Sequence, residues 1–534
     1  MHQTNPDRLP PGPPGRRLKR VPGRGIGAGV GALIATAALL ILAIPPDVGL
    51  AARQAPDTEA EERTGSAIHL LALHGGEGPI SWLSRDRLRG DLEVLARFRP
   101  AYPFWEHVFA IPDGSVAYGD PGDGRLLAVF PTRGDWVEEA RWEEPTLAPI
   151  LWNQALVPNT TRRRDQVADL LRGPGGPAIH NATRGDFVLR NVPRYGPFLE
   201  EWGRIYERFG VPAEIGLSQA MVESGLNPRI RSEAGAMGLC QWLPRNWNRM
   251  RQLSPWEIEG HNQTTQAAYC AAYLTVLATK YGSYLPALSE HHAGGTNVGR
   301  TVINGARLGA ETTREQYLVG SELARDLRQL SRNRYREVVR SYGPRSYLYA
   351  EMVFGNASNV SRLRDEIHQQ RIHAMRAQRP IPLREVVAWT GMSEDEVRRY
   401  NPALVRQVPR GAALYLPLQA DDFGPDVAFW HRPPDPEFAR VLADFLRLDA
   451  SVAEWEDPAF APVLEGYRAR FAATGSEEGI VMATVLAYTM EEAYLSQRPE
   501  ILAAFRADPH IRRLVMEGAE ARGGAGAGVS VSAR

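Results

Sequence analysis

The stretch MVESGLNPRIRSEAGAMGLCQW, residues 221–242, places one carboxylate between an apolar helix and a glycine-rich loop. Gly225 and Asn227-Pro228 predict that the helix ends near Glu223. Burial against apolar side chains disfavours the charged form of a carboxyl group, and a neutral carboxyl can serve as a general acid near neutral pH. The spacing alone is equally compatible with an ordinary solvent-facing glutamate at a helix end.

The surrounding sequence predicts the helices that would position this carboxylate. RYGPFLEEWGRIYERFG, residues 194–210, has an amphipathic stripe that ends at a glycine, and AEIGLSQAMVES follows a proline suited to a first helical turn. TTQAAYCAAYLTVLATKYG, residues 264–282, is long and apolar enough to be a core helix. We therefore expect a compact, mainly α-helical domain over residues 190–335.

The order of residues around Glu223 forms a motif without gaps. Its elements are Glu223-Ser224, Asn227-Pro228, Ser232, the run from Gly235 through Met237 to Gln241, and Pro244. This arrangement resembles the catalytic core of soluble-type lytic transglycosylases, which have the goose-type lysozyme fold. The flanking segments are similar to the membrane-bound lytic murein transglycosylase D group, and the resemblance covers roughly residues 195–325.

The resemblance implies an enzyme that cleaves peptidoglycan between N-acetylmuramic acid and N-acetylglucosamine. Glu223 would protonate the glycosidic oxygen and then take the proton of the 6-hydroxyl, which yields a 1,6-anhydro product without water. Ser232, Met237, Gln241 and His291 would contact the substrate, and no cofactor is expected. Outside such a role, Ser232 and Gln241 would be turn or loop residues.

The sequence departs from the family at His291-His292, which stand where the family has Tyr-Asn beside the acid. A histidine could replace the tyrosine's hydrogen bond, or carry a charge that lowers the pKa of Glu223. Adjacent side chains point apart and no third ligand is spaced nearby, so we expect no metal site. The departure leaves two alternatives: a catalytically inactive glycan-binding scaffold, and a goose-type muramidase that uses water.

Composition and the N-terminus indicate where the chain works. Acidic and basic residues balance at 62 each, so no overall field attracts nucleic acid. A basic segment, residues 1–24, precedes an uncharged apolar segment, residues 25–44, long enough to span a bilayer. We expect either an inner-membrane anchor or a cleaved signal sequence, and a periplasmic location in a bacterial cell envelope. Residues 45–66 have the composition of a linker.

The remaining segments predict a multidomain α+β chain. We expect residues 67–185 to form an α+β region with a small β-meander near 105–142. Residues 380–418 resemble a LysM-type module, or they form a spacer. We expect residues 430–520 to be helical and residues 521–534 to be a low-complexity tail. Cys240 and Cys270 are either a disulfide or two buried thiols. Trp242, Trp247 and Trp256 form a sugar-stacking wall or belong to the core.

Overall fold

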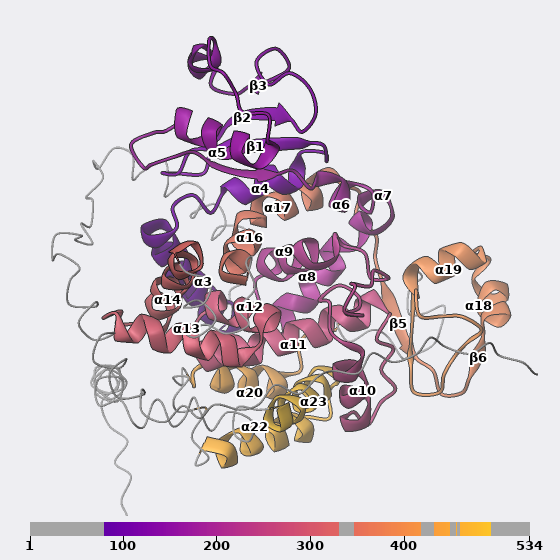
Figure 1. The fold of residues 1–534 in the computed structure, drawn as a ribbon. Coiled ribbons are helices and arrows are strands. Elements are labelled where there is room, and N and C mark those ends of the chain that lie inside the picture. The colour runs from indigo at the N-terminus through magenta and orange to yellow at the C-terminus, as the bar shows by residue number, and fades with distance from the viewer. Residues whose placement is uncertain (1–78, 331–345, 418–431, 449–454, 456–459, 493–534) are drawn as a thin grey trace, which may run out of the picture. The chain divides into compact units, whose positions relative to one another are not determined.

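The structure is a computed structural model that describes residues 79–330, 346–417, 432–448, 455 and 460–492 (Figure 1). The expected anchor or signal sequence at 25–44, the linker at 45–66 and the tail at 521–534 lie outside these residues. Within the described ranges, no helix combines the length and the apolar character needed to cross a membrane.

The first described segment pairs two helices with a small antiparallel sheet. The strands lie in the order β3-β2-β1-β4, and Val116 of β1 faces Phe130 of β2. Residues 105–110, at the start of the predicted β-meander, belong to helix α4 instead, and the fourth strand comes from beyond residue 142. The elements are α3 (Pro79–Phe98), α4 (Phe104–Ala110), β1 (Ser115–Gly119), β2 (Leu126–Pro131), β3 (Arg141–Trp142), η1 (Pro145–Leu151), α5 (Thr160–Leu170) and β4 (Ile179–Ala182).

The middle of the chain is helical, and α11 (Gln263–Tyr281) is buried along nearly its whole length. Asn262 caps its start by accepting a hydrogen bond from the Thr264 amide, and Gly282, at φ +65°, ends it. The other elements are α6 (Gly185–Leu189), α7 (Val192–Tyr195), η2 (Gly196–Phe198), α8 (Leu199–Arg208), α9 (Ala213–Ser224), α10 (Pro244–Leu253), α12 (Tyr284–Ala293), α13 (Gly295–Arg307), α14 (Thr313–Leu330), η3 (Ser346–Leu348), α16 (Tyr349–Gly355) and α17 (Ala357–Glu366).

Residues 373–416 form a small unit of two helices and two short antiparallel strand pairs, with its own apolar cluster. Strand β5 pairs with β8 and β6 pairs with β7. The first strand therefore precedes residue 380, where the sequence suggested that the module starts. The elements are β5 (His373–Arg376), β6 (Ile381–Pro382), α18 (Leu383–Thr390), α19 (Glu394–Tyr400), β7 (Gln407–Val408) and β8 (Ala413–Leu416).

The last described helices pack back onto the middle of the chain. They are α20 (Pro436–Leu446), α22 (Ala461–Ala473) and α23 (Glu477–Glu492). Helix α23 packs against α10, α11 and α22, and α20 packs against α3 and α22. One hydrophobic core consequently includes buried side chains from Leu88 to Tyr488. The core that supports Glu223 thus extends well beyond residues 190–335.

Candidate active site

Glu223 lies in the last turn of α9, with 13% of its side chain exposed. The helix ends at Gly225, whose φ of +58° is left-handed, and a Cβ at this position would lie 2.1 Å from the carbonyl oxygen of Phe187. Only glycine satisfies both the conformation and the close approach. The glycine therefore fixes where the helix stops and holds the carboxylate at the start of the loop.

The loop after α9 is anchored to α11 by one buried glutamine. The side-chain oxygen of Gln266 accepts a hydrogen bond from the Leu239 amide at 2.6 Å, and its Nε2 donates to the carbonyl of Gly260 at 2.6 Å. Gly238, at φ +80°, leaves the space that this side chain fills. Because buried backbone groups need partners, Gln266 determines how the loop passes in front of α11.

Helix α12 brings two imidazoles to the same carboxylate. His292 Nδ1 lies 3.6 Å and His291 Nε2 lies 3.9 Å from Glu223 Oε1. His291 Nε2 also lies 2.7 Å from the carbonyl oxygen of Cys240. A carbonyl only accepts, so this nitrogen must carry the proton and donate it to the loop. His291 thus holds the loop, whereas His292, with 35% of its side chain exposed, faces the carboxylate from the solvent side.

A tyrosine also lies beside Glu223, but it comes from α16. The rings of Tyr349 and His292 are stacked, with centroids 4.4 Å apart and planes at 8°. The buried Tyr349 hydroxyl lies within reach of both Glu223 and Gln219, at looser geometry than the hydrogen bonds of the loop. Burial and the nearby Glu223 raise the pKa of Tyr349, so its hydroxyl keeps the proton that it offers to the carboxylate.

The electrostatics of Glu223 differ from the simple expectation for a buried acid. Burial alone raises its pKa, as the sequence suggested. The contact with His292, the charges of the two imidazoles and the Tyr349 hydroxyl act in the opposite direction, and together they place the pKa of Glu223 below its usual value. Burial lowers the pKa of His291. The empty site therefore favours the carboxylate form of Glu223.

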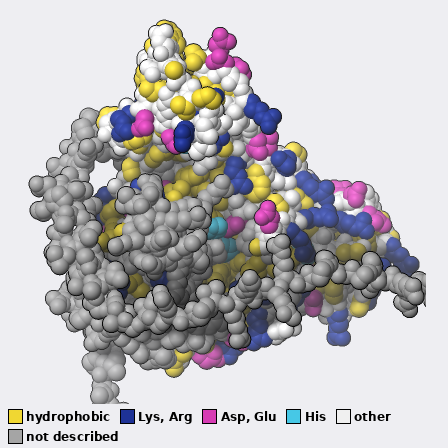
Figure 2. All heavy atoms as spheres, viewed as in Figure 1, with side chains coloured by type: hydrophobic (Ala, Val, Ile, Leu, Met, Phe, Trp, Pro, Cys, Tyr) yellow, Lys and Arg dark blue, Asp and Glu magenta, His cyan; other side chains and the backbone are white. Residues whose placement is uncertain are grey.

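These groups open into a cavity of about 540 Å³. Figure 2 shows histidine side chains next to an acidic side chain on the face turned to the viewer. Glu290 also lines the cavity, but its carboxylate accepts hydrogen bonds from Lys280 Nζ at 3.0 Å and from the Tyr281 hydroxyl. Among the described residues that line the cavity, Glu223 and Glu290 are the two carboxylates, and the second is occupied by a buried lysine.

The other predicted site residues occupy different positions. Ser232 and Gln241 line the cavity. The exposed Ser232 accepts a hydrogen bond from the Ala236 amide, and within the described chain no hydrogen bond joins its hydroxyl to Glu223. Gln241 donates to the Gly238 carbonyl at 2.9 Å. Met237 is buried, and its amide bonds to the carbonyl of Trp242, so its side chain supports the loop from behind.

Two groups near Glu223 come from parts of the sequence that offered no signal for them. Tyr349 lies far along the chain from Glu223, and no motif surrounds it. Tyr488 and Thr489 of α23 form one wall of the cavity, where Tyr488 lies 6.4 Å from Trp242 and 6.0 Å from Tyr273 between ring centroids. Trp242 lines the cavity too, whereas Trp247 is buried behind it in the core.

Cys240 and Cys270 are paired as a disulfide that joins the loop to α11. This resolves the choice between a disulfide and two thiols that the sequence left open. In the described part of the chain, no three His, Cys, Asp or Glu side chains converge as metal ligands would.

Comparison with known families gives one match. Residues 201–312 match the Transglycosylase SLT domain. The matched segment includes Glu223, the loop, the disulfide and both histidines, and it excludes Tyr349 and α23. A search of curated proteins gives no match for this chain. The match places this segment in a lytic transglycosylase or lysozyme-like family, and it indicates a peptidoglycan-degrading activity in the cell envelope.

Proposed function

We propose that the protein is a lytic transglycosylase that cleaves the N-acetylmuramic acid–N-acetylglucosamine bond of peptidoglycan and leaves a 1,6-anhydromuramic acid end. The observation that carries the proposal is Glu223 in the SLT-matched segment, at the edge of a cavity, in contact with His292 and Tyr349. The function rests on one free acid, because Glu290 is engaged by Lys280.

The single acid suffices if the substrate supplies the second group. Most glycosidases use two carboxylates, one as acid and one as base or nucleophile. Here Glu223 donates its proton to the glycosidic oxygen as the bond to the anomeric carbon breaks. The N-acetyl carbonyl oxygen of the same sugar closes onto that carbon and carries the developing charge.

The second step restores the acid. The Glu223 carboxylate takes the proton of the muramic acid 6-hydroxyl, and that oxygen attacks the anomeric carbon as the bond from the acetyl oxygen opens. Glu223 ends protonated and no water is consumed, so the proton balance closes over one turnover. One residue acts as acid and then as base, which requires that both of its forms be accessible near ambient pH.

The surroundings of Glu223 can provide both forms. In the empty site they favour the carboxylate. A glycan strand in the cavity excludes water, which strengthens the effect of burial that raises the pKa of Glu223 and so favours its protonated form. The Tyr349 hydroxyl stabilises the carboxylate that remains after proton donation.

Products from sacculi test the proposal. We expect the exported part of the chain to release 1,6-anhydromuropeptides, identified by mass spectrometry, and Glu223→Gln to abolish their release. Glu233→Gln is the matched control, since Glu233 is an exposed carboxylate in the same loop. Reducing ends in place of anhydro ends would assign a water-using muramidase. Binding to sacculi without turnover, unchanged in Glu223→Gln, would assign an inactive scaffold.

Two further parts of the proposal concern position in the cell wall. Residues 373–416 pair their first and last strands around two helices, which supports a LysM-like glycan-binding unit for the segment near 380–418. We also propose that residues 25–44 anchor the protein in the inner membrane with the remainder in the periplasm. Fractionation of cells that express the full chain, with and without residues 1–44, tests the anchor.

A further inference from the structure

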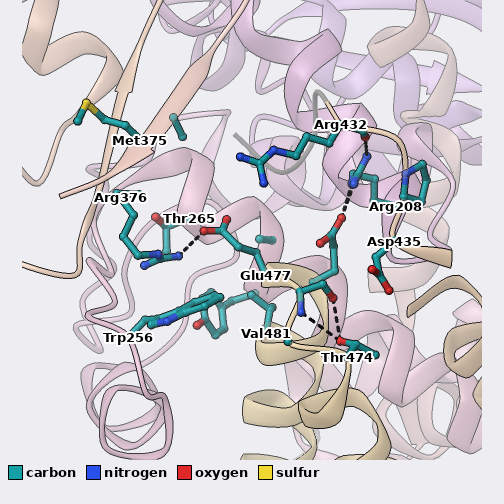
Figure 3. Close-up of a pocket in the computed structure, with 18 of the residues that line it drawn as sticks. Arg208, Trp256, Thr265, Met375, Arg376, Arg432, Asp435, Thr474, Glu477 and Val481 are labelled. Atoms are coloured by element: carbon teal, nitrogen blue, oxygen red, sulfur yellow. Dashed lines mark hydrogen bonds and ion pairs between the residues drawn. The ribbon is translucent and has the colours of Figure 1, made fainter. Parts of the chain in front are cut away.

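A second cavity, of about 610 Å³, lies apart from Glu223 where three parts of the chain meet. Its lining comes from the segment before α11 together with α11 itself, from β5 and β8, and from the ends of the helices α20, α22 and α23 (Figure 3). The volume falls within the roughly 300–1,000 Å³ of small-molecule sites, which also favour junctions between structural units. The proposed reaction does not use this cavity.

Four of the charged side chains that line this cavity form two ion pairs, and Glu257, Arg432 and Asp435 line it as well. Arg208 donates to Glu478 Oε1 from Nε at 2.9 Å and from Nη2, and its Nη1 donates to the Arg432 carbonyl at 2.8 Å. The side chains of this pair are 10% and 3% exposed. Breaking a buried pair leaves an uncompensated charge, which is strongly unfavourable. A ligand that binds beside this pair without breaking it avoids that cost.

The second ion pair is combined with an aromatic ring. Arg376 Nη2 lies 2.6 Å from Glu477 Oε1, and its Nη1 donates to the Gly411 carbonyl at 2.8 Å. Its guanidinium carbon lies 3.8 Å from the centroid of the half-buried Trp256 ring, and Figure 3 shows the two side chains one above the other. The arrangement holds the indole in one orientation at the edge of the cavity.

The polar lining of the cavity also includes several hydroxyl groups. Thr265 Oγ1 lies 2.8 Å from the Tyr415 hydroxyl, and Thr474 Oγ1 lies 2.9 Å from Ser476 Oγ. The Thr474 hydroxyl already donates to the Phe471 carbonyl and accepts from the Ser476 amide, whereas the Thr265–Tyr415 pair can hydrogen-bond to a ligand that is itself rich in hydroxyls. A fixed aromatic ring can stack on the apolar C–H face of a sugar ring. The hydroxyl groups at the edge of that sugar would then lie close to the polar lining of the cavity.

The cavity also lies along the same two helices as the active site. On α11, Tyr269 lines this cavity and Tyr273 lines the Glu223 cavity, one helical turn or about 6 Å further on. On α23, Val481 lines this cavity and Tyr488 lines the Glu223 cavity, two helical turns or about 10 Å further on. A saccharide bound here would lie beside the strand that is cut.

We propose that the cavity between Trp256, Arg376 and the turn before α23 is a second saccharide site, which binds a stretch of N-acetylated glycan. The saccharide class follows from the hydroxyls and the indole of the lining. That the glycan is peptidoglycan, the strand cut at Glu223, rests on the proposed function. The site increases retention on the polymer and takes no part in bond cleavage.

Hydrogen exchange on the full chain tests the site, with the N-acetylglucosamine tetrasaccharide as the probe and Glu223→Gln as the background so that nothing is cleaved. We expect the probe to protect peptides that cover residues 256–269 and 474–481. In Trp256→Ala, about tenfold more probe should be needed for the same protection, and Trp256→Phe should recover part of it. The matched control is Trp82→Ala, because Trp82 is 56% exposed on α3 and lines neither cavity.

Absence of protection at these peptides, or equal protection in Trp256→Ala and its parent, would overturn the site. Protection confined to peptides around Glu223 would overturn it as well, while it would leave the proposed reaction untouched. Failure of the reaction shows separately, as the absence of anhydro products from the wild-type protein. Circular dichroism melting of each variant shows that it is folded.

Discussion

The geometry of the loop is tested most sharply by substituting its two glycines with alanine. Gly235 and Gly238 have almost the same positive φ, +81° and +80°. A Cβ at Gly235 meets nothing within 4 Å, whereas a Cβ at Gly238 would lie 2.3 Å from Nε2 of the Gln266 side chain. The pair therefore separates the cost of the conformation from the cost of the contact.

The two costs differ in size. An alanine in the left-handed region costs about 1–2 kcal/mol, and this applies to both variants. In Gly238→Ala the Gln266 side chain must also move, which leaves the buried Leu239 amide and Gly260 carbonyl without partners. Each unpaired group costs about 1–3 kcal/mol. Gly238→Ala should therefore be less stable than Gly235→Ala by at least about 2 kcal/mol, or about 2–3 °C in melting temperature for a unit of this size.

Calorimetry of both variants, with kinetics on sacculi, measures the difference. We expect kcat/KM to fall more in Gly238→Ala, since the loop also carries Gln241 and the Cys240 carbonyl that His291 contacts. Adding Gln266→Ala to Gly238→Ala should cost less than the sum of the two single changes, because the clash then disappears. Equal melting temperatures for the two glycine variants would show that Gln266 does not hold the loop as described.

Three other predictions concern the cavity and its supports. His292→Asn removes a group that holds the pKa of Glu223 low, so we expect this pKa to rise and Glu223 to stay protonated to higher pH. The alkaline limb of the kcat/KM profile should then move to higher pH. An unmoved limb would show that the contact between His292 and Glu223 plays no part in catalysis. Replacing Cys240 and Cys270 by serine opens a cross-link between residues 30 positions apart and should lower the free energy of unfolding by about 3–4 kcal/mol in denaturant titrations, whereas an unchanged midpoint would contradict this. Tyr488→Ala enlarges the cavity at α23 and should raise KM for glycan strands, while Tyr488→Phe keeps the ring and the KM; equal KM values would mean that α23 does not contact the substrate.

The end of α9 and the loop after it were predictable because their determinants are local. Gly225 takes the left-handed conformation that ends the helix, and Asn227 accepts from the Arg229 amide in the turn that follows. Such signals depend on residues two or three positions apart, so the sequence alone contains them. The choice between roles for Ser232, Gln241 and Met237 depends instead on which way the loop faces, and this is set by Gln266 of α11.

The pKa of Glu223 and the position of Tyr349 depend on packing between distant segments, so local sequence patterns could not predict them. The argument from burial predicted a raised pKa for Glu223, and this effect is present but smaller than the combined effect of its neighbours. The two histidines predicted a lowered pKa for Glu223, and their short distances to its carboxylate agree with that prediction. Tyr349 reaches Glu223 only because α16 packs against α9 and α12, which no local pattern around residue 349 indicates.

Helices outside the family match belong to the same structural unit as the site. Helix α23 buries Met482, Val485 and Leu486 in the core that also contains α11, and its Tyr488 lines the cavity. A fragment limited to residues 201–312 would expose this face of α11 to water, at a cost of about 25 cal/mol for each Å² of apolar surface uncovered. It would also lack the tyrosine that stacks on His292. The chemistry proposed for Glu223 is therefore a property of the larger helical unit, and activity should be measured on the chain that includes α16 and α23.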